Sequence, residues 1–136
     1  MQRSSTRLRP KLGAANTVKP NVGAQIDHEL LDSDDYLYQL VPLLVTHYKP
    51  LKIYLFGSKA RGDSGPNSDY DLMVIVEKRV SPLKRKTFHN ARWDAGLIVA
   101  SDIVLVTQKY FKDRLHLRSS LPSTVAEEGK LLYAAD

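Results

Sequence analysis

Three aspartates stand at the start of two short apolar segments. Asp69 and Asp71 open the run DYDLMVIVE, and Asp102 opens DIVLV. In an extended chain residues i and i+2 point to the same face, so Asp69 and Asp71 project together, about 7 Å apart at Cα. Such carboxylates suit Mg²⁺, which proteins hold through one or two carboxylates plus substrate phosphates. If the segment of Asp102 neighbours the first, the three acids form one cluster for two metal ions that clamp an in-line displacement.

A glycine–serine pair precedes these acids. The apolar run KIYLF leads into Gly57 and Ser58, and ten residues separate Ser58 from Asp69. Glycine lets the backbone approach a ligand closely, and a following helix would present unpaired N–H groups to an anion. The hydroxyl of Ser58 adds a donor. We therefore expect one strand end to bind phosphates and the next to bind metal, as phosphoryl and nucleotidyl transfer require.

Arg61 in the same turn has two interpretations. A guanidinium binds phosphate through two hydrogen bonds, which makes Arg61 a third candidate for nucleotide binding. In the alternative, which is slightly favoured, it pairs with Asp63, Asp69 or a loop carbonyl and braces the turn. The neighbouring Lys59 is expected to face solvent.

Hydrophobic periodicity and turn residues predict the elements that position these side chains. We expect ordered structure from about residue 30, with a first helix up to Tyr48 that Pro42 kinks or splits. Further helices are expected at 59–61, 82–98, 108–115 and 122–129, and strands at 52–56, 69–77, 102–106 and 131–133. This order predicts an α/β (α+β) fold with helices packed against a small mixed β-sheet. Phe88 and Trp93 are expected in its core.

The positive charge of the chain is concentrated at its start. The formal net charge is +5, and residues 1–26 hold five Lys or Arg and no acid, so the other 15 basic and 15 acidic residues cancel. We therefore divide the chain into a flexible basic tail at 1–26 and a near-neutral domain at 27–136, for which nucleic acid is not a favoured partner. A basic stretch on the middle helix is interpreted as a solvated face, with an acidic partner as the less favoured alternative. It comprises Lys84, Arg85, Lys86, His89 and Arg92.

Composition excludes several other classes of protein. The 136 residues suit one domain, and they contain no run of about 18 apolar residues, so no membrane span is expected. Cysteine is absent, which excludes disulfides and thiolate metal sites and fits a reducing compartment such as the cytoplasm. The four histidines show no metal-ligand spacing.

The two patterns together resemble the signature of the DNA polymerase beta nucleotidyltransferase superfamily. FGSKARG at 56–62 and SDYDL at 68–72 carry the resemblance, which extends over about residues 30–134. It is closest to the minimal nucleotidyltransferases (MNT) of bacteria and archaea, whose members include antitoxins of HEPN/MNT toxin–antitoxin pairs. It implies the nucleotidyltransferase fold, with phosphate binding by Gly57 and Ser58. It also implies metal binding by Asp69 and Asp71, with Asp102 as a third carboxylate that helps to activate the attacking hydroxyl.

The function implied by this resemblance is transfer of a nucleoside monophosphate to a hydroxyl. ATP is the expected donor, AMP the transferred group, and two Mg²⁺ ions the cofactors. A HEPN-type protein is the leading acceptor, and an aminoglycoside-like small molecule or an RNA 3′ end are alternatives. A different class of protein stays open, namely a non-catalytic module that binds nucleotide or masks a toxin. The intact acids favour the enzyme.

Overall fold

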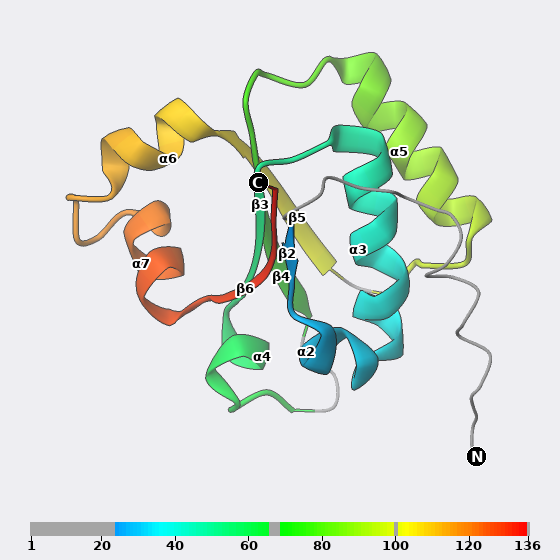
Figure 1. The fold of residues 1–136 in the computed structure, drawn as a ribbon, viewed down its shortest axis with the longest axis horizontal. Coiled ribbons are helices and arrows are strands. Elements are labelled where there is room, and N and C mark those ends of the chain that lie inside the picture. The colour runs from blue at the N-terminus through cyan, green and yellow to red at the C-terminus, as the bar shows by residue number, and fades with distance from the viewer. Residues whose placement is uncertain (1–23, 66–68, 100, 136) are drawn as a thin grey trace.

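The structure, a computed structural model, describes residues 24–65, 69–99 and 101–135. The predicted flexible tail at 1–26 therefore lies outside the described residues except for positions 24–26, and so do residues 66–68 of the predicted loop. A five-stranded sheet of order β2-β6-β3-β4-β5 forms the centre of the described part (Figure 1).

The elements alternate along the chain, as the periodicity predicts. The strands are β2 (Gln25–Ile26), β3 (Lys52–Phe56), β4 (Tyr70–Val76), β5 (Ser101–Thr107) and β6 (Lys130–Ala134). The helices are α2 (His28–Asp32), α3 (Asp35–Tyr48), α4 (Ser58–Arg61), α5 (Pro82–Asp94), α6 (Gln108–Arg114) and α7 (Leu121–Glu128). β4 and β5 pair in parallel, and the other pairs are antiparallel. The mixed α/β fold predicted from the sequence is confirmed.

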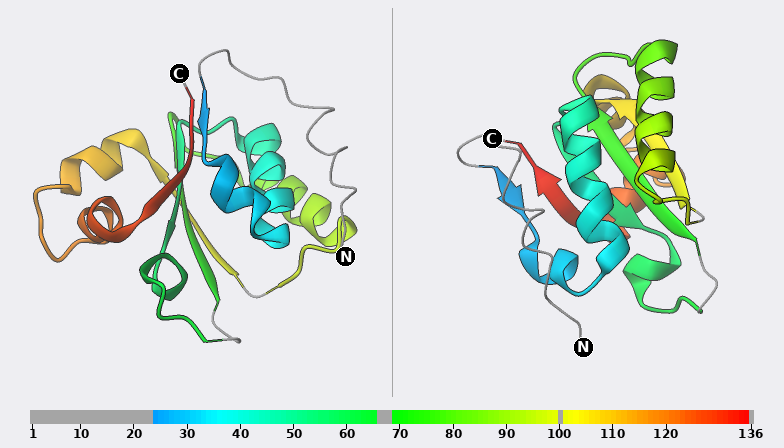
Figure 2. Two further views of the ribbon diagram at one scale, coloured as in Figure 1. Left: turned by 60° about the horizontal axis from the view of Figure 1, so that its bottom comes forward. Right: turned by 90° about the vertical axis from the view of Figure 1, so that its right-hand side faces the viewer.

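Helices cover both faces of the sheet. α2, α3 and α5 lie on one face, and α6 and α7 lie on the other (Figure 2). Leu72 and Val74 of β4 belong to the core shared with α3, whereas Met73 and Ile75 pack with Phe111 of α6. Because β4 is covered on both sides, its sequence is apolar at successive positions and not at alternate ones. The core thus holds β4 in place, and β4 carries Asp71 at its start.

The first long helix contains Pro42 and is not split by it. α3 runs unbroken from Asp35 to Tyr48 with Pro42 inside it, so the chain is not split there. An internal proline costs a helix about 3 kcal/mol. Leu40 and Leu44, on either side of the proline, are fully buried, and this burial outweighs the cost.

The end of α5 differs from the prediction. The helix stops at Asp94 and not at residue 98, because Gly96 turns the chain with a φ of 75°. Phe88 is buried as expected, but Trp93 is 62% exposed, so its prediction as a core residue is wrong. Helical spacing alone did not show that the face with Trp93 has no covering element among the described residues.

β2 and α2 were not predicted from the sequence. Gln25 and Ile26 pair with Ala134 and Tyr133 of β6, so ordered structure begins before residue 27. Asp27 caps α2 by accepting a hydrogen bond from the backbone N–H of Leu30. A two-residue strand has no periodicity to detect, and its pairing depends on a strand over a hundred residues away.

In the described part of the chain, every helix is too short or too polar to cross a lipid bilayer.

Candidate active site

The three predicted aspartates meet at one edge of the sheet. β4 and β5 lie side by side and parallel, and Asp71 is the register partner of Asp102. Asp69 lies two residues earlier, just before β4 begins. Asp69 and Asp102 are exposed, and Asp71 is half-buried. The condition for a shared site, that the two strands are neighbours, is therefore met, and the parallel pairing brings the three carboxylates to the same end of the pair.

The pKa of Asp71 is raised by its surroundings. Burial raises the pKa of Asp71, and the nearby carboxylates of Asp102 and Asp69 raise it further, while Arg61 opposes them. Each of these acids therefore lies close enough to Asp71 to affect its ionisation. Such crowding of like charge is costly without a cation, and a bound divalent ion would relieve it.

Gly57 lies against Asp71. Phe56 of β3 pairs with Asp71 across the antiparallel β3–β4 ladder, so the next residue, Gly57, meets the carboxylate directly. A Cβ at position 57 would collide with Oδ2 of Asp71 and lie 3.1 Å from its Cγ. The φ of Gly57 is 79°, a region that L side chains rarely adopt. Position 57 therefore requires glycine for two reasons, and one of them is the position of the catalytic candidate Asp71.

The turn after Gly57 presents backbone donors. α4 is a single turn, in which the N–H groups of Ala60 and Arg61 donate to the carbonyl of Gly57. The N–H groups of Ser58 and Lys59, and the Ser58 hydroxyl, make no hydrogen bond to another described residue. They lie in the single turn that follows Gly57. This arrangement suits the anionic half of a nucleotide.

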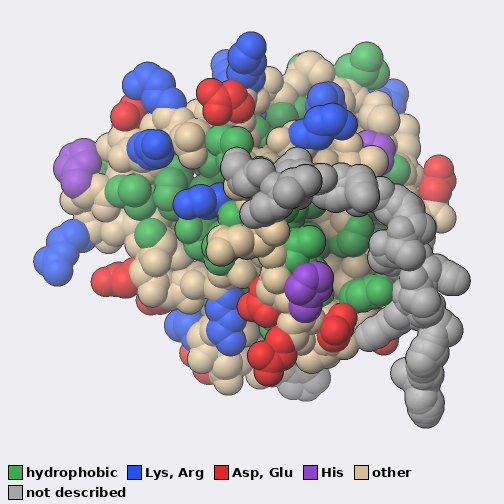
Figure 3. Space-filling model, in the orientation of Figure 1, with side chains coloured by type: hydrophobic (Ala, Val, Ile, Leu, Met, Phe, Trp, Pro, Cys, Tyr) green, Lys and Arg blue, Asp and Glu red, His purple; other side chains and the backbone are tan. Residues whose placement is uncertain are grey.

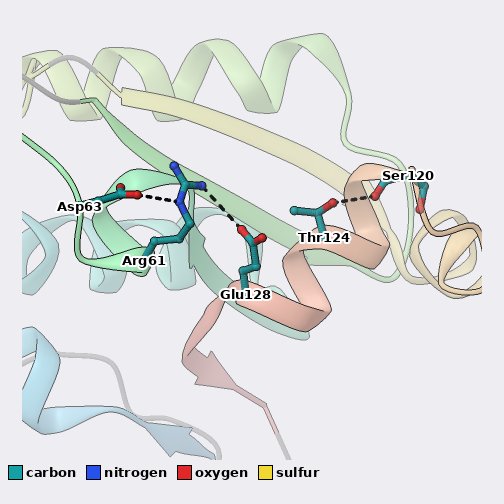
Figure 4. Close-up of polar contacts among 5 residues, drawn as sticks. All are labelled: Arg61, Asp63, Ser120, Thr124 and Glu128. Atoms are coloured by element: carbon teal, nitrogen blue, oxygen red, sulfur yellow. Dashed lines mark hydrogen bonds and ion pairs between the residues drawn. The ribbon is translucent and has the colours of Figure 1, made fainter.

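Arg61 braces α4 against α7. Its Nε donates to Oδ2 of Asp63 at 3.2 Å, and its guanidinium lies 3.6 Å from Oε1 of Glu128 (Figure 4). The pairing with Asp63 agrees with the bracing interpretation. The side chain is 46% exposed, and its positive charge opposes the rise in the pKa of Asp71.

The side chain of Tyr70 points away from Asp69 and Asp71, as alternation along a strand requires. Its hydroxyl donates to the carboxylate of Asp34 at 2.9 Å, and burial together with Asp34 raises the pKa of Tyr70 to about 12. The ammonium of Lys59 lies 4.5 Å from the centre of the Tyr70 ring. Lys59 is half-buried in this contact, so the expectation that it faces solvent is wrong. The ring contact ties α4 to the start of β4.

Arg92 holds the segment that leads into β5, a role that was not predicted from the sequence. Its Nε donates to the carbonyl of Leu97 at 2.9 Å, and its Nη2 donates to the carbonyl of Val99 at 3.2 Å and to the hydroxyl of Ser101 at 2.6 Å. Ser101 directly precedes Asp102. Arg92 thus fixes the chain beside the third carboxylate, and no local signal could have distinguished it from the other basic residues of α5.

The donor set fits a magnesium–nucleotide complex. Among the described residues, no group of three or more His, Cys, Asp or Glu side chains is arranged so that it could hold a metal ion, so a metal here would need ligands from the substrate. Mg²⁺ usually takes one or two carboxylates, with water and substrate phosphates completing its shell. Asp71 with its register partner Asp102 and the exposed Asp69 supplies hard oxygen ligands of this kind. The acids and the turn after Gly57 lie at the same end of the sheet. A metal ion there could take ligands both from the carboxylates and from the phosphates of a nucleotide.

Comparison with known families decides the identity of the fold. The family profile described as "Nucleotidyltransferase domain" matches residues 37–132, which include the Gly–Ser turn and all three acids. The chain belongs to this family. Nucleotidyltransferase domains transfer a nucleoside monophosphate, and that is the enzyme class of this chain. The profile also covers β3 to β5 and most of β6, the strands that position the site.

A solved structure shows the same fold. The nucleotidyltransferase domain resembles a mutant of the toxin–antitoxin complex MntA–HpeT with a TM-score of 0.51 and 24% sequence identity, over 73% of each chain. A toxin–antitoxin structure with AMP-PNP is similar at 27% identity, a TM-score of 0.47, and coverage of 71% of this chain and 72% of that one. A search of curated proteins found no significant match.

Proposed function

We propose that this domain transfers AMP from ATP to a hydroxyl group, with Mg²⁺ as the required metal. The observation that carries the proposal is the meeting of two features at one sheet edge. The first is the turn at Gly57 and Ser58, and the second is the group of Asp69, Asp71 and Asp102. Phosphoryl and nucleotidyl transfer need little more than positioning and charge stabilisation, and these two features supply both.

The reaction follows from this arrangement. Ser58 and the free N–H groups of the turn bind the β- and γ-phosphates and orient the α-phosphate toward the acids. The acceptor oxygen attacks the α-phosphorus, the bond from that phosphorus to the bridging oxygen breaks, and pyrophosphate leaves. Asp102 accepts the proton of the attacking hydroxyl, which contributes about 10²–10⁴ in rate for a well-placed general base.

The metal requirement rests on the acids. Asp69 and Asp71 would hold Mg²⁺, with Asp102 as the third ligand. When bound there, the ions neutralise charge on the triphosphate and on the leaving pyrophosphate. The raised pKa of Asp71 supports this assignment, because burial, Asp102 and Asp69 raise it and the opposing effect of Arg61 is smaller.

We place the acceptor hydroxyl on a partner protein. Three large apolar side chains are exposed around the end of α5 and the segment that leads to Asp102, namely Trp93 at 62%, Ile98 at 57% and Val99 at 48%. Such an apolar surface beside a reactive site is typical of a protein interface and ill suited to a polar, aminoglycoside-like acceptor. A HEPN-type protein is the partner to test first.

The test follows the transferred label. The full chain is incubated with α-labelled ATP, Mg²⁺ and native cell extract, beside Asp69→Asn/Asp71→Asn and a control, Asp32→Asn/Asp113→Asn, that changes two exposed acids on α2 and α6. We expect the wild type and the control to label a macromolecule, and the site variant to lose at least about a hundredfold in labelling. Equal labelling by all three would refute catalysis by these acids. Label on RNA, or on a small molecule alone, would refute a protein acceptor and leave the transfer chemistry intact.

The exposed apolar surface also favours a second candidate, a module that masks a partner without modifying it. A masking protein works equally well after Asp69→Asn/Asp71→Asn but fails after Trp93→Ser/Ile98→Ser. An enzyme fails after either change. Measuring partner inhibition with both variants separates the two functions.

A further inference from the structure

Basic side chains collect at the end of the sheet opposite to the aspartates. β4 is seven residues long, so about 20 Å separates its ends. At its far end lie the loop 77–81, the end of α3 and the start of α5. Five basic residues line the hollows of this end, and we call them the basic edge: Lys49, Lys78, Arg79, Lys84 and Arg85. In Figure 3 lysine and arginine predominate along the upper side of the molecule, and acidic side chains gather at the lower end.

Two adjoining hollows form this edge. One, of about 400 Å³, is lined by Lys49, Lys78, Arg79 and Lys84. The other, of about 450 Å³, is lined by Arg79 and Arg85 and lies along β5 up to Tyr110. The two share Val76, Arg79 and Val80, so they form one continuous depression around the loop after β4. Arg79 is the only residue of the basic edge that lines both.

Within the described residues, the cations of this edge lack acidic partners. Glu77 is the single acid that lines either hollow. The ion pairs found in the described part of the chain involve Arg61 and Lys109, and none includes a member of the basic edge. Uncompensated positive charge in a depression attracts anions strongly, since low-dielectric walls focus the field. The near-neutral total for residues 27–136 conceals this separation of charge.

An exposed aromatic ring extends the second hollow. Tyr110, at the start of α6, lines it and is 41% exposed. The guanidinium of Arg114 lies 3.8 Å from the centre of the Tyr110 ring. A groove that combines cations for the backbone with an exposed aromatic for the bases is the usual arrangement in proteins that bind single-stranded nucleic acid. An acidic protein segment would use the cations but would gain little from a stacking platform.

We propose that the basic edge binds the phosphodiester backbone of single-stranded nucleic acid, with Tyr110 stacking on a base. The site lies at the opposite end of β4 from Asp71 and does not depend on transfer of AMP. Its ligand is recognised by phosphate charge and an unpaired base, chemistry that RNA and DNA share. Arg79 and Lys84 contact the phosphates from the loop and from the first turn of α5.

The test is binding by the full chain to a fluorescent single-stranded 12-mer, as RNA and as DNA, followed by anisotropy over about 50 to 200 mM salt. Arg79→Glu/Lys84→Glu is compared with Lys112→Glu/Arg118→Glu, which reverses one lysine and one arginine outside the hollows. We expect the first variant to lose at least tenfold in affinity and the control less than twofold. The slope of log K against log salt should become shallower by about 1.4, or 0.7 for each lost phosphate contact.

Variants of the tail and of the Tyr110 ring complete the test. Replacement of the five tail cations, Arg3, Arg7, Arg9, Lys11 and Lys19, by glutamine should leave the difference between the two charge variants unchanged. Tyr110→Ala should weaken binding several-fold, while Tyr110→Phe preserves it. Equal binding of RNA and DNA supports recognition through phosphate charge and base stacking, which the two share, and preference for RNA supports the site with the 2′-hydroxyl as an added contact. The proposal is overturned if neither strand binds, if both charge variants weaken binding equally, or if polyglutamate binds as tightly as the oligonucleotides.

Discussion

Asp71 and Asp102 lie directly opposite each other on two parallel strands. The pairing places two carboxylates side by side. They lie at the end of the sheet where β3 ends and Gly57 follows it. Because like charges at short range oppose ionisation, Asp102 is a cause, after burial, of the raised pKa of Asp71. The register of β4 and β5 therefore concentrates negative charge at this site, and a bound cation would neutralise it.

Stability should depend on pH through Asp71. The folded protein holds a proton at Asp71 more tightly than the unfolded chain does, because its folded pKa is raised. Stability therefore falls as the pH rises above the ordinary aspartate value. In metal-free buffer Asp71→Asn should melt higher than the wild type at pH 7, by about 2 °C, and the gain should vanish near pH 3. Thermal melts across this range measure it, and a variant less stable than the wild type at pH 7 would contradict the stated cause.

Gly57→Ala should damage both stability and catalysis. The new Cβ meets the Asp71 carboxylate in a backbone conformation with φ 79°, and the strain costs about 1–3 kcal/mol. Since Asp71 must move, we expect transfer to fall by about a hundredfold.

Gly62→Ala is the matched control for this collision. Gly62 has a φ of 86°, but a Cβ there meets nothing within 4 Å. It carries the backbone strain without the clash, so transfer should stay within a few-fold of wild type. Comparable losses in the two variants would mean that the contact with Asp71 is unimportant.

Arg92→Lys should lower turnover without changing nucleotide affinity. Lysine keeps the charge but cannot hold Leu97, Val99 and Ser101 together as the guanidinium does. The start of β5 loosens, and we expect kcat to fall about tenfold while KM for ATP stays within twofold. Arg118→Lys, at an exposed position, serves as the control. An unchanged kcat would show that Asp102 does not depend on this clamp.

Arg61→Ala and Glu128→Gln should separate the two roles considered for Arg61. Both remove the exposed pair between α4 and α7, and exposed pairs contribute little to stability, so melting should change little in either case. If Arg61 also binds phosphate, we expect KM for ATP to rise about tenfold in Arg61→Ala and less than twofold in Glu128→Gln. Equal KM values in the two variants would leave bracing as its role.

Most elements were predictable because their signals are local. The strand at 52–56 agrees with β3 at both ends, and the helix at 82 begins at Pro82 behind its Ser81 cap. Predictions failed where a distant contact decides. β2 was not predicted, because it needs β6 as its partner. The exposure of Trp93 depends on what covers α5, which spacing along one helix does not contain.

The sequence by itself determined the chemistry available to this protein. Asp-x-Asp at the start of an apolar strand, and Gly-Ser at the end of another, are local patterns whose geometry follows from backbone periodicity. Only the tertiary structure decided which of these groups meet. The parallel register of β4 and β5 places Asp102 opposite Asp71, and the β3–β4 ladder sets Gly57 against the same carboxylate. It also separated acidic from basic side chains at opposite ends of the sheet, because strand direction and not chain order sets where each loop lies.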